Sequence, residues 1–182
     1  MRAPNLPTRD LSKLRPFGPR SEYVNVIVET PKGSRYKYKL EEEQGLFVLD
    51  KAMPTGLHFA FDFGFVPSTR GADGDPLDVL ILTEEPTFPG CLVHAKLLGV
   101  IEAEQTNKKK VERNDRIIAV PIEVSSGNPP AGAPEKLTAE LVRSIEKFFV
   151  SYNALQGRKF KVLRHAGPAR AAALIREGMK TK

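Results

Sequence analysis

The sequence predicts a mainly β protein with some α structure (α+β class), built as a closed β-barrel flanked by C-terminal helices. Two observations lead to this prediction. Short stretches rich in β-branched residues alternate with Gly- and Pro-containing turns through residues 23–124. Beyond residue 134 the spacing of apolar residues changes from a period of two to a helical period. Strands followed by helices favour one barrel with helices packed against it.

The strands are expected in the first two thirds of the chain. Residues 23–30 alternate and are rich in Val and Ile, and residues 35–40 are expected to pair back on them as a hairpin after the Pro-Lys-Gly-Ser turn. Further extended stretches are expected at residues 57–66, 77–83, 92–104 and 116–124. Residues 106–113 carry three consecutive lysines, and an exposed hairpin loop is expected there.

Two helices and one more strand are expected after the Gly/Pro/Ser linker at residues 125–134. Thr138 can cap the first helix, and Glu140 suits its first turn. The apolar stripe of this helix is predicted from its spacing: Leu141, Ile145, Phe148, Phe149, Tyr152 and Leu155. A short strand at residues 159–165 precedes a last helix that begins at Pro168, since Pro is favourable at a first helical position.

Composition narrows the class of protein without choosing a function. The chain has 182 residues, 41% of them hydrophobic and 27% charged, with a net charge of +6 that raises the prior for anionic partners. No apolar run is long enough for a membrane helix, so no membrane partner is expected. Residues 1–20, with four prolines and no apolar core, are predicted to form an irregular basic arm, and residues 21–182 a single domain. The single Cys91 favours a cytoplasmic setting.

The chemistry-bearing motif is the acidic run Asp73-Gly-Asp75-Pro-Leu-Asp78. Three carboxylates converging at the entrance of an apolar strand repel one another unless a cation lies between them, and hard oxygen ligands suit Mg²⁺ or Mn²⁺. A solvated acidic turn is the alternative interpretation, but the run leads directly into a buried strand. A calcium-binding helix-loop-helix is excluded, because Asp78 occupies the sixth position, where the loop needs Gly.

The run resembles the signature of the soluble, magnesium-dependent (family I) inorganic pyrophosphatases. Other segments recur in the same order: residues 28–31 with Lys37-Tyr38, then 45–64, 86–90, 98–100, 119–121, and Phe148-Phe149 with Tyr152. The similarity covers roughly residues 22–178. It implies an OB-like barrel with helices, a cytoplasmic homo-oligomer, and hydrolysis of pyrophosphate to two phosphates.

The resemblance also implies roles for individual residues. Asp73 and Asp78 would bind the activating Mg²⁺, with Mn²⁺ as the alternative ion. Asp75, also at the metal, would help deprotonate the attacking water, and Glu29 would hold metal or water on the opposite side. Phosphate contacts would come from Lys37, Lys51, Arg116 and Tyr152.

The chain departs from the family pattern at several positions in or near this site: Lys39, Lys51, Phe63, Gln105, Asn114 and Asn153. Gln105 and Asn114 stand where the resemblance implies two metal-binding aspartates, and Lys39 stands where it implies an acid. Candidates for a third metal ligand are therefore Asn114, Glu104, Glu112 and Asp115.

Two functions follow from these departures. The first is an active, metal-dependent pyrophosphatase with altered metal demand or substrate range. The alternative is a weakened homologue that binds phosphate compounds or nucleic acid. Nucleic-acid binding ranks well below the enzyme, because the chain has no Trp and the alternation of Phe59, Phe61 and Phe63 fits strand packing equally well. His58, His94 and His165 are scattered and are interpreted as structural or surface residues.

Overall fold

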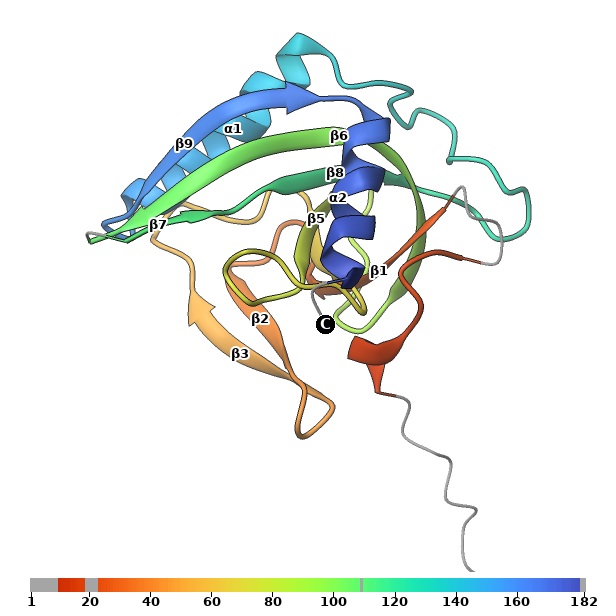
Figure 1. Ribbon diagram of the computed structural model, residues 1–182, viewed down its shortest axis with the longest axis horizontal. Coiled ribbons are helices and arrows are strands. Elements are labelled where there is room, and N and C mark those ends of the chain that lie inside the picture. Colours follow the sequence, from red (N-terminus) through yellow and green to blue (C-terminus); the bar gives the residue numbers. More distant parts are fainter. Residues whose placement is uncertain (1–9, 19–22, 109, 181–182) are drawn as a thin grey trace, which may run out of the picture.

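The computed structural model describes residues 10–18, 23–108 and 110–180 (Figure 1). Its elements follow in this order: a 3-10 helix (Leu11–Lys13), β1 (Val24–Thr30), β2 (Tyr36–Glu41), β3 (Leu46–Ala52), β4 (Asp62–Val66), β5 (Leu77–Ile81), β6 (Leu92–Asn107), β7 (Lys110–Arg113), β8 (Arg116–Pro121), α1 (Ala139–Ala154), β9 (Lys159–Ala166) and α2 (Pro168–Lys180).

Within the described residues, a ring of hydrogen-bonded strands closes on itself. The strands follow the order β1-β4-β5-β8-β6, and β6 pairs again with β1. Only the β5–β8 pairing in this ring is parallel. The far end of β6 extends beyond the ring and pairs with β7 and β9. The predicted closed barrel with helices is therefore confirmed, and Figure 1 shows α1 lying along β9 and α2 crossing the barrel.

The expected hairpin between residues 23–30 and 35–40 is wrong. β2 pairs instead with β3, in a separate two-stranded antiparallel sheet that projects from the barrel (Figure 1). The reason is that β1 already pairs with β4 and with β6, so its hydrogen-bonding edges are taken. β3 is not among the strands that the sequence predicts.

The expected exposed loop at residues 106–113 is mostly strand. β6 continues to residue 107 and β7 begins at Lys110, so only the turn itself is irregular. Lys108 takes a positive φ of 55° at this turn. The two strands therefore bring residues 104–107 and 110–113 into direct register.

Strands buried on both sides supply two apolar clusters. Along β5 and β8, alternate residues go to different clusters: Val79 and Ile117 pack with α2, whereas Leu80 and Ile118 pack with α1. This period of two is the reason that an almost continuous apolar sequence still has two distinct faces. β1 and β4 approach each other closely at Gly64, where an added Cβ would lie 2.1 Å from the carbonyl oxygen of Ile27.

The two helices begin where the sequence predicts. Thr138 caps α1 by accepting a hydrogen bond from the Leu141 amide, and α2 begins at Pro168. The predicted stripe of α1 needs one correction, because Leu155 is 59% exposed and lies beyond the end of the helix. The buried residues of α1 are Val142, Ile145, Phe149 and Asn153. Neither of the two described helices is long and apolar enough to cross a membrane.

The N-terminal segment 10–18 packs against the barrel. Leu11 and Leu14 lie against a small cluster around Ile27, and Phe17 forms a β-bridge with Val24. Pro16 is buried, and its carbonyl accepts a hydrogen bond from the Asn25 amide. The remaining residues of the predicted arm, 1–9 and 19–20, lie outside the described residues. The division into an arm and a domain stays a prediction.

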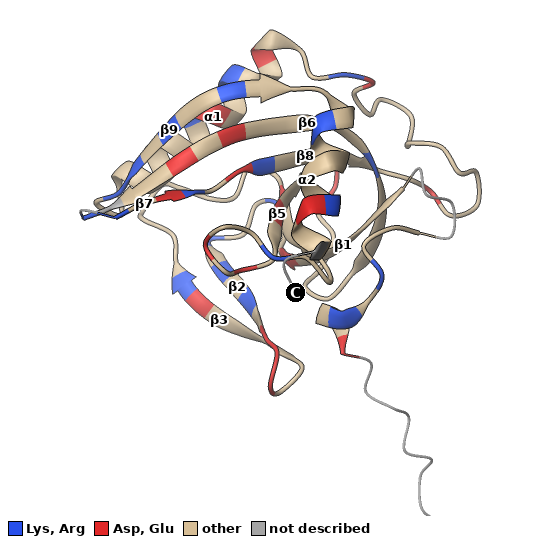
Figure 2. Cartoon of the chain, viewed as in Figure 1, with Lys and Arg blue, Asp and Glu red and all other residues tan. Residues whose placement is uncertain are grey.

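A buried carboxylate ties the far end of β6 to three other elements. Glu102 is 1% exposed and receives charged hydrogen bonds from Arg164 on β9 and from Arg170 on α2, the latter at 3.1 Å. Arg113 on β7 approaches it to 3.3 Å. The hydrogen bond from Arg164, followed by that from Arg170, lowers the pKa of Glu102 to about 2. Figure 2 shows the negative segment of β6 beside the positive segments of β9.

We predict that Glu102→Gln destabilises the fold in a pH-dependent way. The depressed pKa means that Glu102 stabilises the native state above its ordinary value of 4.5, and that this contribution is lost as the pH falls toward 2. At neutral pH the variant should lose about 2 kcal/mol of unfolding free energy in urea titrations. The difference from the wild type should shrink below pH 4.5.

Glu135→Gln is the matched control, because Glu135 is exposed in a loop. It should change stability by less than about 0.5 kcal/mol. A Glu102→Gln deficit of the same size at pH 3 as at pH 7 would show that shape, and not charge, is what Glu102 contributes.

Candidate active site

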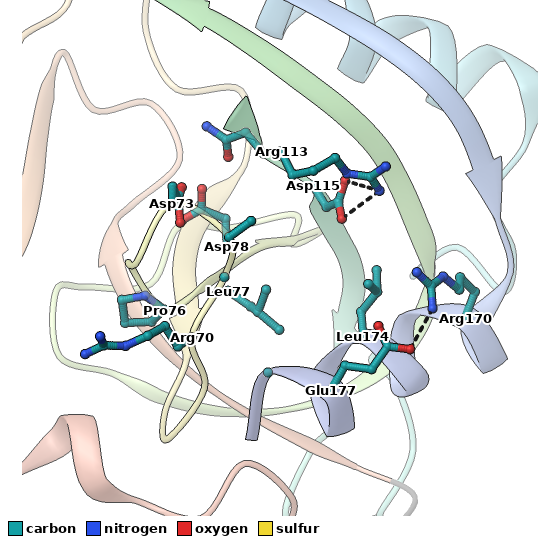
Figure 3. A pocket seen from close by; sticks show the side chains of 14 residues that line it. Arg70, Asp73, Pro76, Leu77, Asp78, Arg113, Asp115, Arg170, Leu174 and Glu177 are labelled. Atoms are coloured by element: carbon teal, nitrogen blue, oxygen red, sulfur yellow. Dashed lines mark hydrogen bonds and ion pairs between the residues drawn. The ribbon is translucent and has the colours of Figure 1, made fainter. Parts of the chain in front are cut away.

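The acidic loop, residues 71–78, is held in shape by its own backbone. The Gly71 amide donates to the carbonyl of Asp75 at 2.7 Å, and the Asp75 amide donates to the Asp73 carboxylate at 3.2 Å. Gly74 takes a φ of +89°, a conformation that favours glycine. The loop thereby directs Asp73 toward Asp78, and these two carboxylates lie side by side in Figure 3.

Asp75 is paired with a lysine of β2. Its carboxylate lies 3.5 Å from the Lys39 ammonium on β2, and its side chain is 65% exposed. Among the described residues, no three His, Cys, Asp or Glu side chains come close enough together to form a metal-binding group. The loop therefore presents the neighbouring carboxylates Asp73 and Asp78 and a third carboxylate, Asp75, beside a lysine. Figure 2 shows the positive segments of β2 next to this loop.

Burial and mutual repulsion raise the pKa of the paired carboxyls. Burial is the main cause for Asp73, followed by the charge of Asp78. For Asp78 burial again comes first, and the nearby Arg116 guanidinium opposes the increase. Both carboxylates are thus held where a positive charge stabilises them. They line a cavity of about 400 Å³ that also includes Asn114 and Asp115.

The second cavity, of about 330 Å³, brings together four of the predicted site residues. It is lined by Glu29, Lys37, Asp75 and Asp78, with Lys39 beside them. Glu29 is 8% exposed and accepts a hydrogen bond from the Leu40 amide at 2.9 Å, so β2 fixes its orientation. Burial raises the pKa of Glu29 to about 7.

Phe63 connects Lys37 to the barrel. The Lys37 ammonium lies 5.7 Å from the centre of the Phe63 ring and 3.7 Å from the carboxylate of Asp50. The guanidinium of Arg116 lies 5.9 Å from the same ring. Phe63 is buried, at 4% exposure, and therefore acts as an apolar wall between two cations.

Lys51 and Tyr152 form a pair of their own. The Lys51 ammonium lies 5.8 Å from the Tyr152 ring and donates to the side chain of Gln156. Tyr152 stacks on Phe148 with nearly parallel rings. Neither residue lines the two cavities around the acidic loop. Cross-strand pairing with Lys37 nevertheless places Lys51 on the same end of the β2–β3 sheet.

The substituted positions Gln105 and Asn114 meet across the hairpin. The amide of Asn114 donates to Gln105 at 3.0 Å, and the Asn114 oxygen accepts from Arg116. Asn153, a substituted position on α1, is buried. Its side chain donates a hydrogen bond to the Phe149 carbonyl, so it takes no part in the cavities.

The acids that could replace a missing ligand are differently placed. Asp115 lines the first cavity, where its carboxylate is bound by Arg113 and by the Ala103 amide (Figure 3). Glu112 pairs with Lys110, and neither Glu112 nor Glu104 lines that cavity.

The aromatic run is largely buried, and the histidines are structural or surface residues, with His58 exposed. Phe59 and Phe63 are buried, at 2% and 4% exposure, so they offer no exposed platform for stacking bases. His94 bonds to Asn25, and His165 pairs with Glu146. These placements agree with the low rank given to nucleic-acid binding.

Several residues around the site were not identified from the sequence. Phe149 and Phe160 flank Arg116, and Arg113 joins Asp115 to Glu102. Their involvement depends on pairing between distant strands, for which no local motif exists. The available signal was the density of charged residues of both signs at residues 102–116.

Comparison with known proteins places the whole chain in one group. The family described as inorganic pyrophosphatase matches residues 26–182. An inorganic pyrophosphatase of Geobacillus stearothermophilus is 32% identical, over 86% of this chain and 92% of that protein. One of Nostoc sp. is also 32% identical, over 94% and 98%.

Solved structures agree with the sequence relatives. The crystal structure of the inorganic pyrophosphatase of Thermus thermophilus superposes with a TM-score of 0.79 at 28% identity, over 95% of this chain and 98% of that one. The Neisseria gonorrhoeae structure gives 0.78 at 29% identity, over 92% and 95%. With a family match over nearly its full length and relatives above 30% identity, this chain belongs to the inorganic pyrophosphatase family.

Proposed function

We propose that this protein hydrolyses inorganic pyrophosphate to two phosphates in a metal-dependent reaction. The observation that carries the proposal is the cavity of about 330 Å³ in which Glu29 and Asp75 face Lys37. Carboxylates beside fixed cations are what a phosphoanhydride hydrolase needs, since the reaction depends on positioning and charge neutralisation. The similarity to enzymes named inorganic pyrophosphatase, over nearly the whole chain, supports the same reaction.

The carboxylate pair Asp73 and Asp78 fits a divalent cation. Mg²⁺ is commonly bound through one or two carboxylates, with water and substrate phosphates completing its coordination. Two crowded carboxylates on one cavity match that requirement, and Asp115 and Asn114 offer further oxygens there. Mn²⁺ is the alternative, because it accepts the same hard ligands. When bound, such an ion neutralises phosphate charge and lowers the pKa of water.

The chain's own residues bind the substrate and move the proton. Lys37 contacts phosphate oxygens inside the cavity, and Lys51 with Tyr152 contacts the part of the substrate that lies outside it. Arg116 adds positive charge behind Lys37. Phe63 excludes water from the space between Lys37 and Arg116. The electrostatic attraction of these two cations for phosphate is then stronger.

Asp75 is the proton acceptor in the proposed reaction. As the water oxygen bonds to one phosphorus, Asp75 takes one of its protons, and the bridging P–O bond breaks to release the second phosphate. Glu29 holds the water or an ion from the opposite side, in the orientation set by the Leu40 amide.

The enzyme acts in the cytoplasm as a homo-oligomer. A single cysteine in the sequence agrees with a reducing compartment. Exposed apolar residues on β3 offer a surface for self-association, with Leu46 and Leu49 at 58% and 57% exposure.

The first prediction of the proposed function concerns metal binding by the carboxylate pair Asp73 and Asp78. Mg²⁺ or Mn²⁺ should raise the melting temperature of the wild type, because an ion that binds only the native state stabilises it by about 2.7 kcal/mol at 100 times its Kd. Asp73→Asn should lose most of that shift. Asp10→Asn is the control, since Asp10 caps the 3-10 helix and Asn caps as well. Equal shifts in both variants would place the ion elsewhere.

Proton transfer makes the second prediction. Asp75→Asn keeps the shape of the side chain but removes the acceptor, so the rate of phosphate release with Mg²⁺ should fall about a hundredfold or more. The variant should keep the metal-induced shift in melting temperature, because Asp73 and Asp78 remain. If Asp75→Asn keeps a tenth or more of the wild-type rate, Asp75 is not the base. A wild type without activity above background would remove the enzyme proposal itself.

A further inference from the structure

Arg116 is the most deeply embedded cation near the acidic loop. The residue is 5% exposed, and its guanidinium lies 4.8 Å from the centre of the Phe149 ring. Phe63 and Phe160 complete an aromatic enclosure at 5.9 Å each. Cation–π attraction is strongest where the cation is desolvated, so Arg116 is fixed in position rather than free to follow a ligand.

The polar contacts of Arg116 point at the acidic loop. Its Nη1 group donates to the carboxylate of Asp78 and to the side-chain oxygen of Asn114, and at 3.2 Å to the carbonyl of Asp115. Its buried Nε has no partner among the described residues. Arg116 lines neither of the two cavities around the loop. In this arrangement it contacts Asp78, and does not face the space in which a substrate would lie.

The neutral pair Gln105–Asn114 sets the orientation of this contact. Because the Asn114 amide group donates to Gln105, its oxygen is turned toward Arg116. Neither amide carries a charge, and among the described residues Asp78 is the one carboxylate that Arg116 bonds through its side chain. The guanidinium therefore hydrogen-bonds Asp78, and its charge also acts on Asp73, where it opposes the increase in the pKa of that carboxyl.

We propose that Arg116 is a built-in counter-cation that positions Asp78 and occupies one of its carboxylate oxygens, and thereby sets the affinity of this site for a divalent ion. The inference rests on the proposed metal site at Asp73 and Asp78. A metal ion that reaches Asp78 finds one of the two carboxylate oxygens already hydrogen-bonded to Arg116. The negative charge of the carboxylate is also offset by the guanidinium. Arg116 thus weakens metal binding while holding Asp78 in the orientation that the reaction uses, and it is a positioning residue.

The test measures Mn²⁺ binding to the substrate-free full chain by the electron paramagnetic resonance signal of free Mn²⁺. An opposite charge within hydrogen-bond distance changes the ionisation equilibrium of a carboxyl about tenfold to a thousandfold. A metal ion bound to the same carboxylate experiences the same electric field from the guanidinium. Arg116→Gln should therefore bind Mn²⁺ at least about tenfold more tightly than the wild type. Its kcat for pyrophosphate should fall, because Asp78 loses its support.

Arg116→Lys is the second variant. It tests the inference in the event that Arg116→Gln does not fold. Lysine keeps the charge but lacks the fork that reaches Asp78 and Asn114 together. It should tighten Mn²⁺ binding by less than Arg116→Gln does. The control is Arg143→Gln on α1, an exposed arginine away from the loop, which should leave Mn²⁺ affinity unchanged.

A direct substrate contact predicts a different outcome. In that case both Arg116 variants raise the KM for pyrophosphate and leave the Mn²⁺ affinity of the substrate-free protein within twofold of the wild type. That result overturns the inference. Weaker Mn²⁺ binding in well-folded variants overturns it as well. The Mn²⁺ measurement does not depend on turnover. A wild type that binds Mn²⁺ but fails to hydrolyse pyrophosphate therefore refutes the proposed function and leaves the inference about Arg116 to be decided by the variants.

Discussion

The long strand β6 is the constraint on which the rest of the structure depends. Its first part pairs with β1, its middle with β8, and its last part with β9 and β7. One strand can serve so many partners only by bending, and its pairing shifts register between Leu97 and Gly99 and again after Glu102. Closure of the ring by β6 leaves no free edge on β1, and this in turn forces β2 and β3 to form their own sheet. The same strand carries Glu102 and Gln105, so it positions both the stabilising charge cluster and the residue that accepts a hydrogen bond from Asn114.

Charge matching across elements is the second constraint. The acidic loop brings three carboxylates to the entrance of a buried strand, which is unfavourable without nearby positive charge. The matching cations come from elsewhere in the chain: Lys39 on β2 reaches Asp75, and Arg116 on β8 reaches Asp78. Arg116 can reach because β8 lies parallel to β5, with Ile117 opposite Val79. The fold therefore neutralises the loop one carboxylate at a time, and Asp73 is the member for which no such lysine or arginine contact is found in the described part of the chain.

Local features of the sequence predicted local structure well. The acidic loop, the cap at Thr138 and the start of α2 at Pro168 depend on residues a few positions apart, and the sequence contains all of that information. The barrel could be predicted as a class, because the order of strands and helices is visible in the periodicity. The pairing of β2 could not, since it depends on which edges of β1 are already used. For the same reason the contacts of Arg116 with Asp78 and three aromatic rings could not be predicted, since they arise only when β4, β5, β8, β9 and α1 come together; its role in substrate binding stays a prediction.

The substitutions in the site have one electrostatic direction. Relative to the pattern that the resemblance implies, Gln105 and Asn114 remove two negative charges, and Lys39 replaces a negative charge with a positive one. A site that relied only on mobile cations would lose attraction for them with each of these changes. Here the cations that remain are built into the chain, and they are rigid: Arg116 is enclosed by rings, and Lys37 lies against Phe63. Fixed cations need no binding step, but they also cannot be displaced to make room. The balance between these two effects decides how much of the phosphate charge is neutralised by the protein and how much by metal ions. The Arg116–Asp78 contact is therefore the point at which this chain differs most from a site built of aspartates alone.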